Sequence, residues 1–433
     1  MAMDGKELVE KLAKLSQVQS IKDIPHLTHA LFPGTHCPLM GAAMAVGGIK
    51  DSLIVVVGTD ECTYYTKSMT IHSEKFGGID GRCVSVVLDD HDVTFGSAEK
   101  VQEAFKEIIE EYRLQCVFLV TTCVIEIIGD DFDAISEGLS ELYGIPVLPV
   151  HTEHFKCEDH LPGLERTITV CAEMMKSCDS DNSVNLLGQR MGDFATTELY
   201  AMLQKAGVKI GLQLPCGCSV DDIKNAAAAK VNIVVNDIAL PLAQKMQEKF
   251  GIPYVYFNKF VIPEKIYEAY KNLFGYLELE LPGELEGLYQ NAREKIEKNK
   301  GELEGITYIY GNTPYAVFEM NCFLSSLGMV PQVIQTNRYT EADEPYAKEI
   351  LQYTDPYVCK AANIAPLQYV YDVLSPYLYL GHEFGNRLRQ KGIAIVHSDR
   401  ASGMLGFEVT GYLLQQLVKS VREAKEYRKE LGL

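Results

Sequence analysis

The stretch Ser52-Leu-Ile-Val-Val-Val-Gly58, followed by Thr59-Asp60-Glu61-Cys62, decides the fold class of this chain. Its β-branched apolar run is typical of a strand that is buried on both faces, as in a parallel sheet. The run Cys116-Val-Phe-Leu-Val-Thr121 has the same character. Between the two runs lies a predicted amphipathic helix, whose apolar positions share one face: Val101, Phe105, Ile108, Ile109 and Tyr112. This order of elements indicates a βαβ unit.

The same pattern returns twice further along the chain. An apolar run at 184–188 leads through a predicted helix to a second run at 208–212. Another run at 306–311 leads through a predicted helix to a run at 330–334. The sequence therefore predicts an α/β fold of three Rossmann-like parallel-sheet domains.

Two polar stretches mark the expected domain boundaries. One is the linker at 177–183, and the other is the charged helical stretch at 284–304. We expect domains at 1–183, 184–304 and 305–433. A chain of 433 residues agrees with this number, since a domain takes roughly 150 residues.

The charge balance excludes two classes of partner. The chain has 40 Lys and Arg against 59 Asp and Glu, a formal net charge of −19. This argues against nucleic acid and against an anionic membrane surface, because both bind basic footprints. No segment reaches about 18 consecutive apolar residues, and the N-terminus has no signal-peptide core. There Leu8, Leu12 and Leu15 fit a helical stripe instead. We therefore expect a cytoplasmic protein without a transmembrane helix.

Three of the twelve cysteines lie in similar contexts. Cys62 lies four residues beyond the first run, and Cys123 lies directly after the run at 116–121. Because the carboxyl ends of parallel strands meet at one sheet edge, we expect these two thiols to converge. Cys37 lies in a Gly-Pro loop before a small-residue helix, which allows close approach to a bulky group. Three converging thiolates suit a soft metal or an iron–sulfur cluster. Buried core thiols are the alternative, since no compact C-x-x-C motif is present.

Three runs around these cysteines resemble the nitrogenase component 1 family. They are Cys37-Pro-Leu-Met-Gly-Ala42, Gly58-Thr-Asp-Glu-Cys62 and Val120-Thr-Thr-Cys123-Val-Ile-Glu-Ile-Ile-Gly-Asp-Asp131. The likeness is greatest to the β subunit of the molybdenum–iron protein. The family also contains its α subunit, cofactor-scaffold proteins and subunits of dark-operative protochlorophyllide reductase. The resemblance spans nearly the whole chain.

The resemblance implies a metal cofactor and two partners. Cys37, Cys62 and Cys123 would ligate an iron–sulfur cluster at a subunit interface, either a P-cluster-like eight-iron cluster or a [4Fe–4S] cluster. The second subunit would be a paralogous or identical component 1 chain, in a heterotetramer or a homo-oligomer. The electron donor would be a P-loop iron protein that hydrolyses ATP. This chain itself has no G-x-x-x-x-G-K-[ST] motif.

The chain also departs from the family pattern. The nitrogenase α subunit binds its catalytic cofactor through one Cys and one His. Asn236 stands at or near that Cys position, and the segment 402–407, which resembles the His region, has no His. His397 lies five residues earlier and is an offset candidate. The chain is therefore either a β-type subunit without cofactor ligands or one that holds a different substrate or cofactor in the same cavity.

Three further cysteines are candidates for a second metallocofactor. Cys157 lies in a loop at 151–160 that also holds three histidines, and is either a metal ligand or part of a loop near the cluster. Cys216 and Cys218 form a C-x-C pair, which either ligates a cluster or makes a tight loop near the cavity. The other six are interpreted as core or surface thiols: Cys83, Cys116, Cys171, Cys178, Cys322 and Cys359. Arg82, Arg190 and Arg338 either line a cavity for an anionic substrate or are solvated.

The resemblance implies an enzyme. We expect the iron–sulfur subunit of a nitrogenase-like oxidoreductase, which accepts electrons from the ATP-dependent iron protein and reduces a substrate other than dinitrogen. A tetrapyrrole and a small sulfur compound are both candidate substrates. The alternative function is a scaffold on which a complex iron–sulfur cofactor is assembled.

Overall fold

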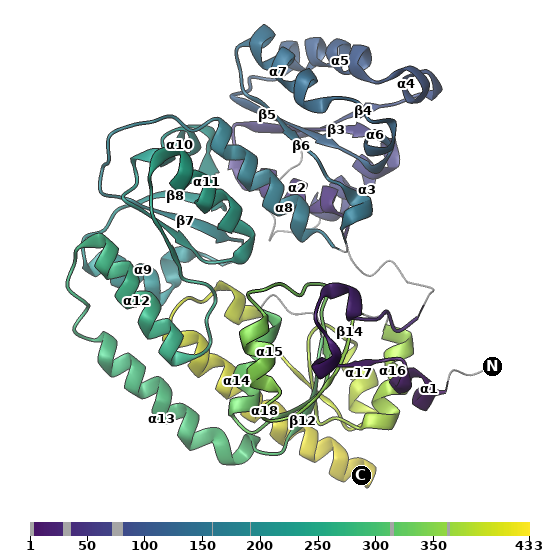
Figure 1. The fold of residues 1–433 in the computed structure, drawn as a ribbon, viewed down its shortest axis with the longest axis vertical. Coiled ribbons are helices and arrows are strands. Elements are labelled where there is room, and N and C mark those ends of the chain that lie inside the picture. The colour runs from purple at the N-terminus through teal and green to yellow at the C-terminus, as the bar shows by residue number, and fades with distance from the viewer. Residues whose placement is uncertain are drawn as a thin grey trace.

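Three parallel sheets follow one another along the chain, each with helices packed on it (Figure 1). The computed structural model describes residues 4–28, 36–71, 81–157, 159–190, 192–311, 316–361 and 364–433. The predicted α/β class with its parallel sheets is therefore confirmed. Within the described residues, every helix is too short or too polar to span a bilayer.

The first sheet has the strand order β4-β3-β5-β6, and all its strands are parallel. The strands are β3 (Ser52–Gly58), β4 (Cys83–Val87), β5 (Cys116–Thr121) and β6 (Val147–Val150). Every residue of β3 and β5 is buried, as the apolar runs predict. Alternate residues of β3 face opposite layers. Leu53 packs toward α5 (Ala98–Glu111) and α7 (Phe132–Tyr143), and Ile54 packs toward α2 (Pro38–Gly47) and α8 (Leu161–Val170).

The second sheet has the order β11-β10-β7-β8, again parallel. Its strands are β7 (Val184–Gln189), β8 (Ile210–Pro215), β10 (Val231–Val234) and β11 (Tyr254–Tyr256). Its helices are α9 (Glu198–Lys205), α10 (Val220–Lys224), α11 (Leu240–Phe250) and α12 (Pro263–Leu277). A short parallel ladder between β2 (Ile49–Lys50) and β9 (Cys218–Ser219) joins it to the first domain. The apolar core is continuous between these two domains.

The third sheet has the order β1-β14-β13-β12-β15-β16. Its parallel strands are β12 (Thr307–Tyr310), β13 (Val330–Gln335), β14 (Tyr357–Cys359), β15 (Leu378–Leu380) and β16 (Ala394–Val396). Its helices are α14 (Val317–Ser326), α15 (Glu344–Ile350), α16 (Ile364–Leu374), α17 (Gly385–Arg389) and α18 (Phe407–Leu431). The long helix α13 (Leu285–Leu303) leads into this domain and packs against α18 (Figure 1).

The N-terminal stretch corrects one expectation. The predicted helical stripe through Leu15 is wrong in extent, because α1 (Gly5–Glu10) ends before it. Residues 13 and 14 instead form β1, which pairs antiparallel with β14 at the edge of the third sheet. Leu15 is buried in the core of that domain. Pairing with a free sheet edge therefore overrides the helical spacing of the leucines.

Candidate functional site

The three cysteines of the predicted cluster site all lie at helix N-termini. Cys37 is the N-cap of α2, Cys62 is in the first turn of α3 (Asp60–Ile71), and Cys123 is the first residue of α6 (Cys123–Ile128). All three are partly exposed. The first N–H groups of a helix have no partner within it, and the helix dipole is positive there. N–H groups at such positions are able to donate to sulfur, and the thiolate is the form of cysteine that binds metal.

The charges of Cys62 and Cys37 act on the thiol of Cys123. Burial raises the pKa of the Cys123 thiol, and the charges of Cys62 and Cys37 raise it further. Backbone N–H groups of Cys123 and Val124 lower it. Within the described residues, no three side chains of His, Cys, Asp or Glu lie close enough together to hold one metal ion. A multi-iron cluster spreads its thiolates over several iron atoms, so its ligands stand farther apart than those of a single ion.

A close approach of two backbone segments fixes the position of Cys123. The Thr122 hydroxyl donates a hydrogen bond of 2.9 Å to the Val57 carbonyl. A Cβ at Gly58 would lie 2.0 Å from Thr122 Oγ1, so only glycine fits there. Nearby, Thr59 Oγ1 lies 3.5 Å from Cys62 Sγ and donates to it. The ends of β3 and β5 thus hold the two cysteine-bearing turns together.

A second glycine contact fixes the helix that follows Cys37. A Cβ at Gly41 would lie 1.9 Å from the His160 carbonyl, and a Cβ at Gly163 would lie 1.8 Å from the Pro38 carbonyl. Helices α2 and α8 therefore meet backbone to backbone. This contact links Cys37 to the elements that follow the 151–157 loop.

Cys157 lies in that loop, with a different set of neighbours. Its thiol donates to the Thr152 carbonyl at 3.6 Å, and Arg166 Nη1 lies 3.7 Å from its sulfur. Burial raises its pKa, and the charges that act on it come from Arg166, Glu153 and Asp159 rather than from the three other cysteines. The loop is tied to the Cys123 helix, since Glu153 N donates to Glu126 Oε1 at 3.2 Å.

Both cysteines of the C-x-C pair line one pocket, Cys216 partly exposed and Cys218 buried. Cys216 donates to the Arg190 carbonyl at 3.3 Å. Cys218 is buried in β9, where burial raises the pKa of its thiol to about 12. Of the six cysteines interpreted as core or surface thiols, five are buried and Cys178 is exposed, which confirms that interpretation.

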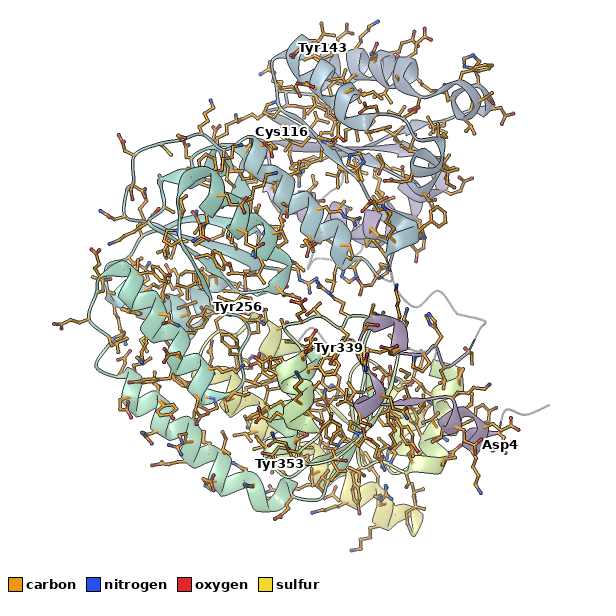
Figure 2. The ribbon with its side chains drawn as sticks, viewed as in Figure 1. Asp4, Cys116, Tyr143, Tyr256, Tyr339 and Tyr353 are labelled. Atoms are coloured by element: carbon orange, nitrogen blue, oxygen red, sulfur yellow. The ribbon has the colours of Figure 1, made fainter. Side chains whose placement is uncertain are left out.

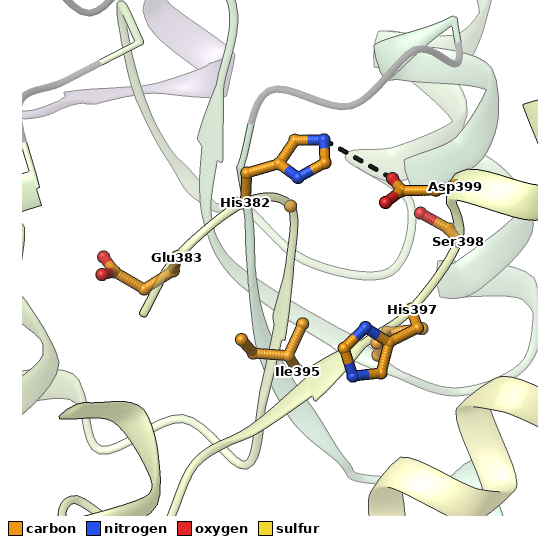
Figure 3. Close-up of a pocket in the computed structure, with 8 residues that line it drawn as sticks. His382, Glu383, Ile395, His397, Ser398 and Asp399 are labelled. Atoms are coloured by element: carbon orange, nitrogen blue, oxygen red, sulfur yellow. Dashed lines mark ion pairs between the residues drawn. The ribbon is translucent and has the colours of Figure 1, made fainter. Parts of the chain in front are cut away.

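His397 lies apart from the cysteines, at the carboxyl ends of β15 and β16 (Figure 3). The small pocket there has a volume of about 130 Å³. His382 Nε2 lies 3.5 Å from Asp399 Oδ1 across it. His397 is not among the described residues that line the larger cavity below.

A cavity of about 420 Å³ opens where the domains meet. Tyr256 of the second domain lines it (Figure 2), as does Tyr346 of the third. Asn236, at the predicted cofactor position, lines it and uses its side chain to accept from Ile238 N at 3.2 Å. Among the described residues that line the cavity there is no cysteine and no histidine. None of these residues therefore offers a thiolate or imidazole for a metal in the cavity.

Two of the three predicted arginines line this cavity. Arg190 faces it, and Arg338 pairs with Asp237 at 3.2 Å. The interpretation of Arg82 as a cavity residue is wrong. Its guanidinium donates to the carbonyls of Ile49 and Gly47 at 2.7 and 2.9 Å, where it joins the backbone of the first domain.

Acidic residues on the cavity wall were missed by the sequence reasoning. Burial raises the pKa of Glu319 to about 7, and burial also raises the pKa values of Glu165 and Asp343. The signal for Glu319 was present in the sequence, because a carboxylate stands in the mostly apolar stretch Val317–Leu324, which has one other polar residue, Asn321, on a helix that is buried nearly all round.

The comparisons with known proteins agree with this architecture. A family model described as nitrogenase component 1 type oxidoreductase matches residues 37–422. The nitrogenase iron-molybdenum cofactor biosynthesis protein NifE of Clostridium pasteurianum is 31% identical over 224 residues, 51% of this chain and 49% of that protein. NifE of Rippkaea orientalis is 24% identical over 331 residues, 73% and 69% of the two chains. The nitrogenase molybdenum-iron protein alpha chain of Methanosarcina barkeri is 25% identical over 309 residues, 68% and 58%.

This chain thus spans about half to two thirds of the length of these curated relatives. A solved structure of nitrogenase Cp1 at pH 6.5 has the same fold, with a TM-score of 0.78 over 92% of this chain and 94% of that chain, at 15% identity. A second structure of Cp1, at pH 5, gives a TM-score of 0.67 over 97% of each chain, at 18% identity.

Proposed function

Because this chain belongs to the nitrogenase component 1 type oxidoreductase family, we propose that Cys37, Cys62 and Cys123 hold an iron–sulfur cluster that a second subunit completes. The observation that carries the proposal is the placement of three partly exposed thiols at three helix N-termini, with Cys62 and Cys37 close enough to Cys123 for their charges to raise the pKa of its thiol. The cluster would supply one-electron transfer. The side chains and N–H groups of this chain would bind it, orient it and set its charge environment.

The surface beside these cysteines supports a shared site. Large apolar side chains on the same elements are exposed: Tyr64 and Tyr65 on α3, Ile127 on α6 and Phe155 in the 151–157 loop. Exposed apolar patches of this kind are typical of protein interfaces. Three thiolates also leave one iron of a four-iron cluster without a protein ligand from this chain. A second component 1 subunit, identical or paralogous, would cover the patch and supply that ligand.

The proposed role is the iron–sulfur subunit of a nitrogenase-like reductase. An iron protein that hydrolyses ATP would deliver the electrons, since this chain carries no P-loop motif. The reducible substrate would bind in the 420 Å³ cavity. The lining residues would hold it by hydrogen bonds, charge and apolar contact rather than by a cysteine and a histidine.

A second candidate function is a scaffold for cofactor assembly. Several relatives bear names of cofactor biosynthesis proteins, and a cavity without cysteine or histidine on its described wall would bind a metal cluster without a strong bond to metal. Weak retention suits a protein that passes its cargo on.

The first experiment measures iron and acid-labile sulfide per chain on protein purified without oxygen. We expect about four iron per chain, lost in Cys123→Ala. Cys178→Ala is the matched control, because Cys178 is exposed and lies outside the predicted site. Full retention of iron in Cys123→Ala, or no iron in wild-type protein made together with assembly machinery, would overturn the cluster assignment.

The second experiment separates the two functions. With a reduced iron protein and ATP, a reductase subunit turns over substrate many times. A scaffold yields cofactor that can be transferred to another protein, with little substrate reduction.

A further inference from the structure

Glu319 is a carboxylic acid in an unusual place. It is 3% exposed, lies on the predominantly apolar helix α14, and lines the central cavity. One carboxyl oxygen accepts from Val261 N at 3.4 Å, and the other accepts from the Tyr346 hydroxyl at 3.3 Å. No role in cluster binding or in packing accounts for a carboxyl group at this position.

A hydrogen-bonded chain leads outward from this acid. The Tyr346 hydroxyl on α15 also accepts from Lys265 Nζ, which lies over the Tyr346 ring at 3.9 Å from its centroid. Lys265 is on α12 and is partly exposed. Three helices thus contribute one donor or acceptor each to a continuous path between solvent and the cavity.

We propose that Glu319 donates protons to the molecule that is reduced in the central cavity, and that Tyr346 and Lys265 reload it from solvent. This inference rests on the proposed reductase function, and it names the acid which that function requires. The described cavity wall offers no histidine for the task.

Each transfer moves one proton through three side chains. The O–H bond of Glu319 breaks, and its proton goes to the substrate atom that has gained negative charge from the reductant of the proposed function. The carboxylate then takes the Tyr346 hydroxyl proton while Tyr346 takes one from the Lys265 ammonium. Lys265 is reprotonated by water. One proton moves from solvent to substrate, and the three side chains return to their starting states.

The surroundings bring the pKa of this acid into the neutral range. Burial raises its pKa to about 7, while the charge of Lys265 and the hydrogen bonds from Val261 and Tyr346 lower it. A proton donor works best when its pKa lies near the working pH. Other titratable or charged groups around it or across the cavity are Tyr256, Cys322, Asp237, Arg338 and Asp343.

Two other cavity acids with raised pKa values, Asp343 and Glu165, are less suited to the role. Asp343 accepts from both N and Oγ1 of Thr340, at 2.8 and 2.9 Å, and these bonds stabilise its carboxylate. Glu165 lies 4.0 Å from the Arg338 guanidinium, which also favours the ionised form. Glu319 alone among these three is joined to a partly exposed ammonium through a hydroxyl.

Infrared spectroscopy of the purified full-length protein tests the proposal without turnover. The carbonyl stretch of a protonated carboxylic acid should titrate with a midpoint near pH 7 and be lost in Glu319→Gln. It should remain in the control Asp343→Asn. A band that is missing from the wild type, or unchanged in Glu319→Gln, would overturn the proposal.

The reloading path has its own readout. After transfer to D₂O, the shift of the Glu319 band should be at least about tenfold slower in Tyr346→Phe than in the wild type. Equal rates would exclude Tyr346 as the relay. Iron content, measured on the same preparations, tests the cluster assignment separately. A failure of the proton-donor role of Glu319 is therefore distinguishable from a failure of the cluster assignment.

Discussion

The buried carboxyl of Glu319 makes the stability of this protein depend on pH in a definite direction. Raising its pKa from the ordinary 4.5 to about 7 corresponds to about 3 kcal/mol against the ionised form. Below pH 4.5 the group is protonated in both the folded and unfolded chain, and it costs nothing. As the pH rises toward 7 the folded chain holds more protons than the unfolded one, so stability falls. Above pH 7 the full cost is present.

Glu319→Gln removes this cost and keeps one of the two acceptor oxygens, which can take the place of the one that accepts from Val261 N or the one that accepts from the Tyr346 hydroxyl. The variant should be more stable than wild type by about 3 kcal/mol at pH 8 but by only about 1 kcal/mol at pH 5.5. Urea unfolding at both pH values measures this difference in the free energy of unfolding. Hydrogen exchange of peptides from α14 is the readout, because it reports the unfolding of the third domain itself. The exposed control Glu341→Gln should change stability by less than about 0.5 kcal/mol. A Glu319→Gln variant that is less stable than wild type at pH 8 would refute the reasoning, because it would mean that Lys265 stabilises the ionised carboxylate by more than burial destabilises it.

Three other substitutions test separate parts of the structure. Gly58→Ala should lower both the Tm and the iron content, because the new Cβ would lie 2.0 Å from Thr122 Oγ1 next to Cys123. The control Gly138→Ala, where the new Cβ meets open space on α7, should instead raise the Tm slightly. Thermal denaturation and iron analysis of the two variants distinguish these outcomes. Burial lowers the pKa of Lys259 to about 7, so the cost of burying its charge is greatest below pH 7. In urea unfolding, Lys259→Met should therefore stabilise the chain by about 3 kcal/mol more at pH 6 than at pH 9. This pH trend is opposite to that of Glu319→Gln. Phe105→Ala should cost about 3–5 kcal/mol, seen as a lower urea midpoint, because its ring is 1% exposed in the first-domain core.

Much of the fold could be predicted from the sequence because its central strands are buried on both faces. Such strands need continuous apolar runs, so the runs at 52–58 and 116–121 identify β3 and β5 directly. The two-residue strand β1 carries no such pattern. It exists because the edge of β14 is available for pairing, and that is a property of the folded third domain rather than of residues 13 and 14.

The candidate site divides in the same way. The approach of Cys62 to Cys123 follows from the rule that parallel strands end at one edge, and the effect of the Cys62 charge on the pKa of Cys123 agrees with it. The cavity wall could not be predicted from such a rule, because its residues come from all three domains and meet only after the domains pack. Arg82 shows the limit of residue type as a guide. An arginine in an α/β chain can serve a ligand or bind its own backbone, and here it binds carbonyls of residues 47 and 49.

Helix α8 connects the two regions on which the proposals rest. Its Gly163 meets the Pro38 carbonyl directly after Cys37, and on the same helix Leu161 and Glu165 line the cavity. Backbone contact of this kind leaves no flexible side chain to absorb a displacement, since closely packed interiors transmit strain. A shift of the Cys37 turn when a second subunit docks therefore has to move α8 or open the α2–α8 contact, and movement of α8 changes the cavity wall. In the proposed reductase, a change at the subunit interface near Cys37 would thus alter the shape of the cavity in which Glu319 gives up its proton.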